Sequence, residues 1–193
     1  MSLEIKNLTK RFGKKTIISE FSYHFSEKGL YILRGKSGIG KTTLLRIIAG
    51  LDKDYSGEII EGGIGRVSFA FQEYRLFPQL SALENVMIAS KDDGDANKNI
   101  AMDLLSQLGF SFEEMSLLPS ELSGGMKQRV SLARTFMKNA PVILLDEPTK
   151  ELDAILCRQV CEMIKKIAED KLVILVTHRD DDISLLDGEL IDL

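Results

Sequence analysis

The sequence lacks any apolar stretch of membrane-spanning length. Its longest apolar runs, residues 142–145 and 172–176, are far shorter than the ~20 residues that span a bilayer. We interpret both runs as buried strands. Residues 1–5 do not combine a basic segment with an apolar one, so we expect no signal peptide and a cytosolic protein.

The chain also lacks a dominant charge and has only two cysteines. Its 193 residues carry a formal net charge of -4, and the composition is 28% charged and 44% hydrophobic. This balance excludes disorder, argues against a nucleic-acid partner and suits one domain with a sizeable core. Cys157 and Cys161 lie four apart in a predicted helix, while His24 and His178 are far away in sequence. We therefore interpret the thiols as semi-buried side chains on one helical face, and we assign His24 a structural role.

Hydrophobic periodicity divides the chain into strands and helices. Strands are predicted over residues 3–8, 16–25, 30–33, a pair at 58–60 and 67–71, then 142–145, 172–177 and 189–193. Helices are predicted over residues 42–49, 81–89, 97–108, 125–137 and 154–168. Because strands alternate with helices at both ends of the chain, we expect a parallel α/β sheet with a helical insertion.

A glycine-rich loop joins the predicted strand 30–33 to the helix 42–49. Its residues, Gly35, Lys36, Ser37, Gly38, Ile39, Gly40, Lys41 and Thr42, match the phosphate-loop pattern G-x-x-x-x-G-K-[ST] in full. Glycines let backbone N–H groups surround phosphate oxygens, and the following helix directs its positive end at the same anion. Lys41 adds a charge for the β- and γ-phosphates, and the Thr42 hydroxyl can bind Mg²⁺. A chance glycine-rich turn is the alternative, but the strand before and the helix after favour a nucleoside triphosphate site.

The apolar run 142–145 ends in two carboxylates, Asp146 and Glu147. A buried parallel strand delivers such a pair to the carboxyl edge of its sheet, where ligands bind in open α/β folds. Asp146 is then suited to hold Mg²⁺, and Glu147 to polarise an attacking water as general base. An ordinary acidic cap on the next loop is the alternative, and the phosphate loop upstream weakens it.

A second glycine-containing turn, Ser123, Gly124 and Gly125, precedes the predicted helix 125–137. Such a turn makes a second anion site at a helix N-terminus. The alternative is a plain N-cap, in which Ser123 satisfies the first helical N–H groups. That alternative explains the serine but not a second phosphate-type site in a chain that already has one.

These ordered motifs resemble those of the ATP-binding cassette (ABC) ATPases over nearly the whole chain. The loop 35–42 is similar to the Walker A motif, the pair Asp146 and Glu147 to Walker B, and residues 122–128 to the signature motif. The resemblance implies an α/β P-loop NTPase core, mostly a parallel sheet with flanking helices, plus N-terminal antiparallel β strands and an inserted α-helical subdomain. We expect one domain over residues 1–193, with a nucleotide-binding core at 1–72 and 140–193 and the helical signature subdomain at about 73–139.

The resemblance also assigns roles to residues. Gln72 resembles the Q-loop glutamine that reaches Mg²⁺ and the attacking water, and His178 the switch histidine that touches the γ-phosphate. Phe12 stands where an aromatic residue stacks on adenine, although a plain surface aromatic is the alternative. Leu152 and Asp153 resemble the end of the D-loop. The implied catalytic residues are Glu147, His178, Gln72 and Lys41, the implied metal ligands are Thr42, Gln72 and Asp146, and Thr43 joins Phe12, the loop 35–42 and Ser123, Gly124 and Gly125 in binding ATP.

The family's mechanism implies the partners. Two copies pair head to tail, so that each ATP lies between the Walker A loop of one copy and the signature turn of the other. Transmembrane permease subunits dock beside the Q-loop, here residues 73–78, which read equally as a hinge between lobes. The implied location is the inner face of the cell membrane, bound peripherally through the permease, with an extracytoplasmic solute-binding protein as a further partner of the complex.

The sequence pattern does not distinguish import from export as sharply as it indicates the ATPase family. The pattern most resembles bacterial importer subunits of the nitrate, sulfonate and taurine group. Stand-alone ATPases of lipoprotein-release and of peptide or drug export systems share much of it. Soluble cassette ATPases of DNA repair, chromosome cohesion or ribosome function are a third class, but they carry coiled coils or tandem cassettes that this chain does not show.

Two segments depart from the family pattern. Lys150 and Glu151 are bulky and charged where the D-loop usually has small residues, and they would lie at the dimer seam. After His178, the acidic residues Asp180, Asp181 and Asp182 are expected to lead almost directly into the last strand, without the helix that the family usually has there.

Overall fold

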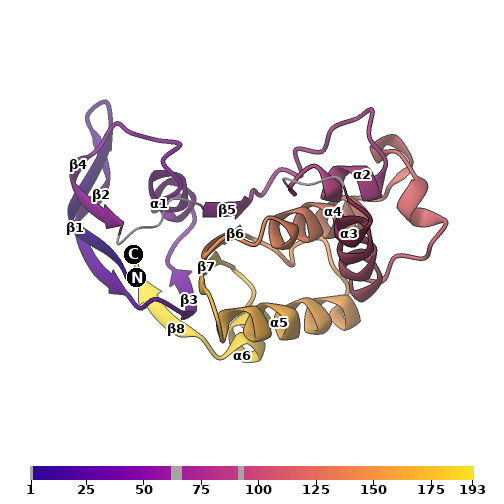
Figure 1. Cartoon of the computed structure of the whole chain (residues 1–193). Coiled ribbons are helices and arrows are strands. Elements are labelled where there is room, and N and C mark those ends of the chain that lie inside the picture. The colour runs from indigo at the N-terminus through magenta and orange to yellow at the C-terminus, as the bar shows by residue number, and fades with distance from the viewer. Residues whose placement is uncertain (1, 62–66, 91–93) are drawn as a thin grey trace.

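The computed structural model describes residues 2–61, 67–90 and 94–193 and contains two sheets (Figure 1). The strands are β1 (Leu3–Phe12), β2 (Lys15–Phe25), β3 (Gly29–Arg34), β4 (Ser56–Glu61), β5 (Val67–Ala70), β6 (Val142–Asp146), β7 (Leu172–Val176) and β8 (Glu189–Asp192). The helices are α1 (Lys41–Ile48), α2 (Ala82–Met87), α3 (Asp95–Gln107), α4 (Gly124–Met137), α5 (Ala154–Ala168) and α6 (Asp180–Leu186), with short 3-10 turns η1 (Glu114–Ser116) and η2 (Pro119–Glu121).

The larger sheet is parallel and runs in the order β5-β6-β7-β3-β8. β6 and β7 are buried along their full length, because both faces of the sheet are covered. Successive residues alternate between the two faces, so that Leu144 packs in the core around α1 whereas Ile143 and Leu145 pack in the core around α4 and α5. The unbroken apolar runs therefore form buried strands, as predicted.

The smaller sheet is antiparallel, in the order β2-β1-β4, and lies on the far side of α1 from the parallel sheet (Figure 1). Its apolar side chains Leu3, Ile5 and Leu8 share one buried core with Leu44 and Leu45 of α1. The helix that follows the phosphate loop is thus enclosed between two sheets.

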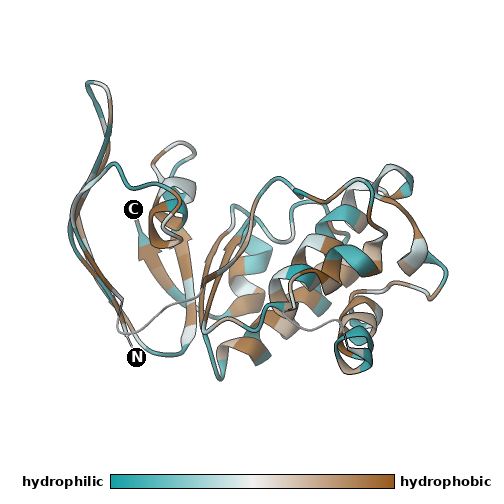
Figure 2. Ribbon diagram, turned by 45° about the horizontal axis from the view of Figure 1, so that its top comes forward, coloured by the Kyte–Doolittle hydropathy of each residue, from teal (hydrophilic) through white to brown (hydrophobic). Residues whose placement is uncertain are grey.

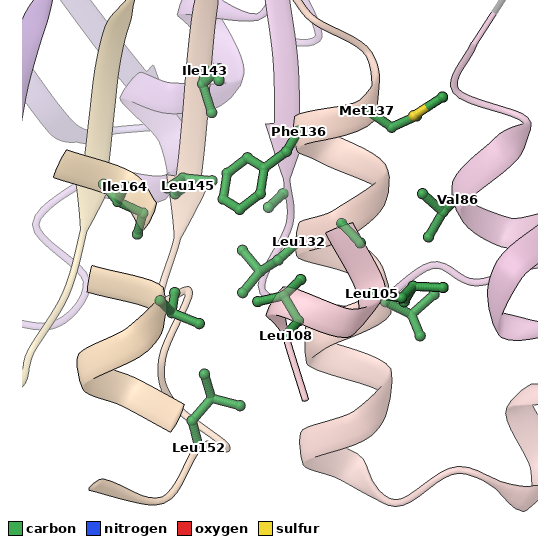
Figure 3. Packing of buried hydrophobic residues seen from close by; sticks show 14 of the residues in the cluster. Val86, Leu105, Leu108, Leu132, Phe136, Met137, Ile143, Leu145, Leu152 and Ile164 are labelled. Carbon is green, nitrogen blue, oxygen red and sulfur yellow. The ribbon is translucent and has the colours of Figure 1, made fainter. Parts of the chain in front are cut away.

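The helices α2, α3 and α4 form the other end of the molecule (Figures 1 and 2). Figure 3 shows how α4 joins this region to the sheet: Phe136 lies close to Leu145 of β6, while Leu105 of α3 and Val86 of α2 lie on the other side of α4. The predicted fold, an α/β P-loop NTPase core with N-terminal antiparallel strands and a helical insertion, is confirmed.

Two predictions about elements were wrong. β4 and β5 are not a pair, because β4 is bonded to β1 in the antiparallel sheet and β5 to β6 in the parallel sheet. A short apolar run gives no information on its partner, which non-local packing decides. The segment after His178 is not a bare connector either, since it contains α6. Its three aspartates occupy the first helical turn, where negative charge favours a helix.

The cysteines are more buried than expected. Cys157 and Cys161 are both free thiols, and each is almost completely covered because α6 packs over α5. His24 lies on β2 opposite Glu4 of β1. Within the part of the chain that the structure describes, no helix combines the length and the apolar character needed to cross a membrane.

Candidate functional site

One cavity, above the carboxyl end of the parallel sheet, gathers most of the predicted nucleotide-binding residues. Its lining comprises Phe12, Ile17, Ser37, Gly38, Gly40, Lys41, Thr42, Thr43, Gln72, Glu147, Val176 and His178. These residues come from β1, β2, the phosphate loop, α1 and the ends of β5, β6 and β7, which are far apart in sequence. The fold therefore brings four separate motifs to one site.

The phosphate loop has the backbone that its glycines permit. Gly40 has φ +117°, and a Cβ there would lie 2.8 Å from Cγ2 of Ile17, so a side chain is excluded by both conformation and space. The ammonium group of Lys41 donates to the carbonyl oxygens of Gly35 (2.7 Å) and Lys36 (3.1 Å). Burial lowers the pKa of Lys41, and the nearby carboxylates of Glu147 and Asp146 oppose that shift. The loop thus holds this cation within itself, at the place where phosphate oxygens are expected.

The three predicted metal ligands meet in a smaller neighbouring cavity. Thr42, Gln72 and Asp146 all line it, together with Arg46, Phe71, Glu73 and Arg75. Burial raises the pKa of Asp146, and a hydrogen bond from Thr42 opposes the rise. A hydroxyl, an amide oxygen and a carboxylate are the hard oxygen donors that Mg²⁺ prefers, so the residues present fit that ion.

Glu147 has a strained backbone at the end of β6. Its φ is +52°, which is unfavourable for a residue with a side chain, and such strain persists only where the surroundings enforce it. Its N–H donates to the carbonyl of Val176 (2.9 Å), and the buried Gln128 amide donates to the carbonyl of Pro148 (3.1 Å). The carboxylate then faces His178, whose Nε2 is 3.2 Å from Oε1. The predicted base and switch histidine are therefore in direct contact.

Phe12 lies at the rim of this cavity. It ends β1 and is 55% exposed, which is high for a large apolar side chain. The ammonium group of Lys10 lies 4.9 Å from the centre of its ring. An exposed ring at the mouth of a phosphate-loop cavity is suited to stack against a nucleobase.

Comparison with known proteins decides the family. The model of the ABC transporter family matches residues 18–150. The chain is 34% identical to the glutamine transport ATP-binding protein GlnQ of Escherichia coli, covering 91% of this chain and 80% of that protein. It is 36% identical to the aliphatic sulfonates import ATP-binding protein SsuB 1 of Shouchella clausii, covering 94% and 73%.

The chain belongs to the ABC transporter family. A solved dimeric ATP-binding cassette in a post-hydrolysis state, with ADP and Pi bound, superposes with a TM-score of 0.87 at 30% identity, covering 99% of this chain and 94% of that one. This cassette accordingly binds and hydrolyses ATP.

The signature turn of the cassette is not part of the cavity lining. Ser123 is the N-cap of α4, and its hydroxyl accepts from the N–H of Met126 (3.2 Å), as the N-cap interpretation requires. A Cβ on Gly125 would lie 2.7 Å from the carbonyl oxygen of Glu151, so the D-loop backbone packs directly on this glycine. Sequence reasoning missed this second reason for a glycine, because the contact joins residues 26 positions apart. The role of Ser123, Gly124 and Gly125 in binding ATP stays a prediction.

Ile39 and Lys150 contact residues of the site although neither lines its cavity. Ile39 packs on Gly35, with its Cγ2 3.1 Å from where a Cβ on Gly35 would stand. Lys150, one of the departures from the cassette pattern, places its ammonium group 3.5 Å from Oε2 of Glu147. Neither the contact of Gln128 with the backbone of Pro148 nor that of Lys150 with the Glu147 carboxylate was predicted, and the only sequence signal for either residue is its place within a motif.

Proposed function

We propose that this chain is the ATP-hydrolysing subunit of an importer, and that Glu147 is its general base. The observation that carries the proposal is the single cavity in which Phe12, the phosphate loop, Gln72, Glu147 and His178 meet. ATP lies with its adenine on Phe12 and its phosphates on the N–H groups of the loop and on Lys41. Mg²⁺, held by Thr42, Gln72 and Asp146, would neutralise charge on the phosphates.

In this proposal, the residues around Glu147 carry out the hydrolysis step. Its carboxylate accepts a proton from the attacking water, and Gln72 helps to orient that water. Nε2 of His178 lies 3.2 Å from the Glu147 carboxylate. The histidine is therefore placed to contact the γ-phosphate and to hold the carboxylate in position toward the attacking water. The strained backbone at Glu147 supports this assignment, because strain of this kind gathers at functional sites.

A second copy of the chain completes the site. The signature turn lies outside the cavity of its own chain and presents a helix N-terminus that suits an anion. We therefore propose the head-to-tail dimer, in which Ser123, Gly124 and Gly125 bind the nucleotide of the partner. A solved cassette of 30% identity that is dimeric with ADP and Pi bound supports the pairing of two copies.

An apolar groove is the proposed docking site for a permease helix. Its lining includes Leu51, Phe69, Phe71, Phe77 and Ile88, together with the cations Arg134 and Lys138. Arg134 donates to the carbonyls of Tyr74 (2.9 Å) and Arg75 (2.8 Å), so the loop 73–78 is tied to α4. A helix seated there would act on the Q-loop and on α4 together, which reconciles the socket and hinge interpretations. Docking of this kind would hold the cassette at the inner face of the membrane.

Import is proposed because relatives named for glutamine transport and sulfonate import align over most of this chain. No substrate is proposed, since those names differ among relatives of similar identity. A permease encoded beside this chain together with a secreted binding protein would support import, whereas a permease without one would favour export.

The deciding experiment uses Glu147→Gln. The variant should bind ATP with wild-type affinity, lose hydrolysis and accumulate as a dimer in gel filtration with ATP. A variant that hydrolyses ATP at the wild-type rate would refute the general-base assignment. Mixing Lys41→Ala with Ser123→Arg should restore activity at one composite site per dimer, and failure of that rescue would count against the shared site alone.

A further inference from the structure

Asp182 of α6 is a fully buried carboxylate that touches no part of the proposed nucleotide cavity. Its Oδ2 accepts from the hydroxyl of Thr177 (2.9 Å) and from that of Thr149. Its Oδ1 accepts from the thiol of Cys157 (2.9 Å), and Nε of Arg179 is 3.6 Å away. One side chain thus gathers groups from the D-loop, from the segment around His178 and from α5.

Arg179 forms a second link between the D-loop and the segment around His178. Its Nη1 donates to the carbonyls of Thr149 (2.9 Å) and Leu152 (3.4 Å) in the D-loop. Its own N–H donates to the hydroxyl of Thr177 (3.2 Å), which closes the turn around His178. The side chains of Asp182 and Arg179 therefore tie residues 149–152 to residues 177–179.

A metal ion is an alternative explanation for part of this cluster, because ligand atoms of Cys157, Cys161 and Asp182 lie within 4.8 Å of one another. The hydrogen bonds argue against it. The thiol of Cys157 donates to Oδ1 of Asp182 (2.9 Å), and Nε of Arg179, which carries a positive charge, lies 3.6 Å from the same oxygen. Both oxygens of Asp182 already accept hydrogen bonds. The cluster is accounted for as a hydrogen-bonded network.

We propose that Asp182 is a positioning residue that couples the D-loop to the switch histidine. The carboxylate fixes Thr177 and Thr149 together, so that His178 reaches Glu147 while the D-loop rests on Gly125. A displacement of the D-loop, such as dimer closure would require, is thereby transmitted to the histidine. This inference rests on the proposed roles of Glu147 and His178.

The test removes each hydroxyl without changing the shape of the side chain. Thr149→Val and Thr177→Val each remove a hydroxyl that donates to Asp182. Asp182 itself is left in place because its removal could unfold the chain. We expect each to lower kcat for ATP hydrolysis by roughly tenfold, since small misplacements of catalytic groups have large effects on rate. The Kd for ATP should stay within twofold, because neither threonine lines the cavity. Thr149→Ser and Thr177→Ser keep the hydroxyl and should retain kcat.

Cys157→Ala is the matched control. It removes a donor from the same carboxylate but belongs to neither loop, so it should lower the thermal midpoint and leave kcat within twofold. The double variant Thr149→Val/Thr177→Val should be no slower than the slower single variant, because both changes break the same connection through Oδ2 of Asp182.

Two results would overturn the inference: kcat within twofold of wild type in both valine variants, or effects of the two that multiply in the double variant. Glu147→Gln and His178→Ala serve as references. If they hydrolyse ATP normally, the proposed site itself is wrong, and that failure is distinct from the failure of the coupling.

Discussion

Because the D-loop packs on the signature turn, we expect Gly125→Ala to lower the stability of the folded chain. A Cβ at this position would lie 2.7 Å from the carbonyl oxygen of Glu151, whereas ordinary contacts are 3.4 Å or more. The D-loop must therefore shift by about 0.7 Å, and overpacking of this kind costs about 1–3 kcal/mol. Alanine regains at most about 1 kcal/mol from its better helix propensity.

The net loss expected for Gly125→Ala is thus about 1 kcal/mol, which lowers Tm by roughly 2–4 °C in a chain of this size. The measurement is thermal unfolding by circular dichroism without nucleotide, so that binding effects do not contribute.

Gly124→Ala is the control on the same helical turn. There the nearest atom, 3.1 Å from the new Cβ, is Oε2 at the flexible end of the Glu151 side chain, which can move aside. This variant should match or exceed the wild-type Tm. Equal Tm values for the two alanine variants, or the reverse order, would refute the argued packing of the D-loop on Gly125.

Three further predictions concern the site and the thiols. Lys41→Ala should weaken ATP binding at least about tenfold by calorimetry, because hydrogen bonds from a charged group contribute about 1.5–3 kcal/mol; unchanged affinity would contradict the role of Lys41. Excess EDTA should abolish ATP hydrolysis and added Mg²⁺ should restore it, whereas turnover that persists in EDTA would exclude the metal set Thr42, Gln72 and Asp146. Cys157 and Cys161 should react with Ellman's reagent at pH 8 at least roughly a hundredfold more slowly in the native chain than in urea, since burial raises both pKa values and keeps the thiols protonated; equal rates would show that α6 does not cover them.

The sequence alone predicted those parts of the fold and site whose residues are contiguous along the chain. The phosphate loop and the acidic end of β6 are of this kind, because a strand, a loop and a helix follow one another there without interruption. The unbroken apolar runs likewise identified β6 and β7 as buried on both faces.

Contacts between distant residues were not predictable in the same way. The run Asp180, Asp181 and Asp182 was predicted to be a short connector to the last strand, yet Asp182 is buried and accepts a hydrogen bond from Thr149, 33 residues earlier. The burial of Cys157 and Cys161 follows from α6, so a missed helix led to an underestimate of their burial. Lys150 was expected at a dimer seam, and its 3.5 Å approach to Glu147 depends on a turn whose shape the sequence does not encode locally.

The position of α1 between the two sheets has a consequence for ligand-dependent stability. Leu44 and Leu45 belong to a core shared by β1, β3 and β7, while Lys41 and Thr42 at the start of the same helix line the nucleotide cavity. Neither sheet can separate from α1 without disturbing the phosphate loop. Nucleotide at a hundredfold excess over its Kd, which stabilises a folded protein by about 2.7 kcal/mol, should therefore slow hydrogen exchange in both sheets together. Bound ATP would thus stabilise the packing of both sheets on α1 in addition to being the substrate.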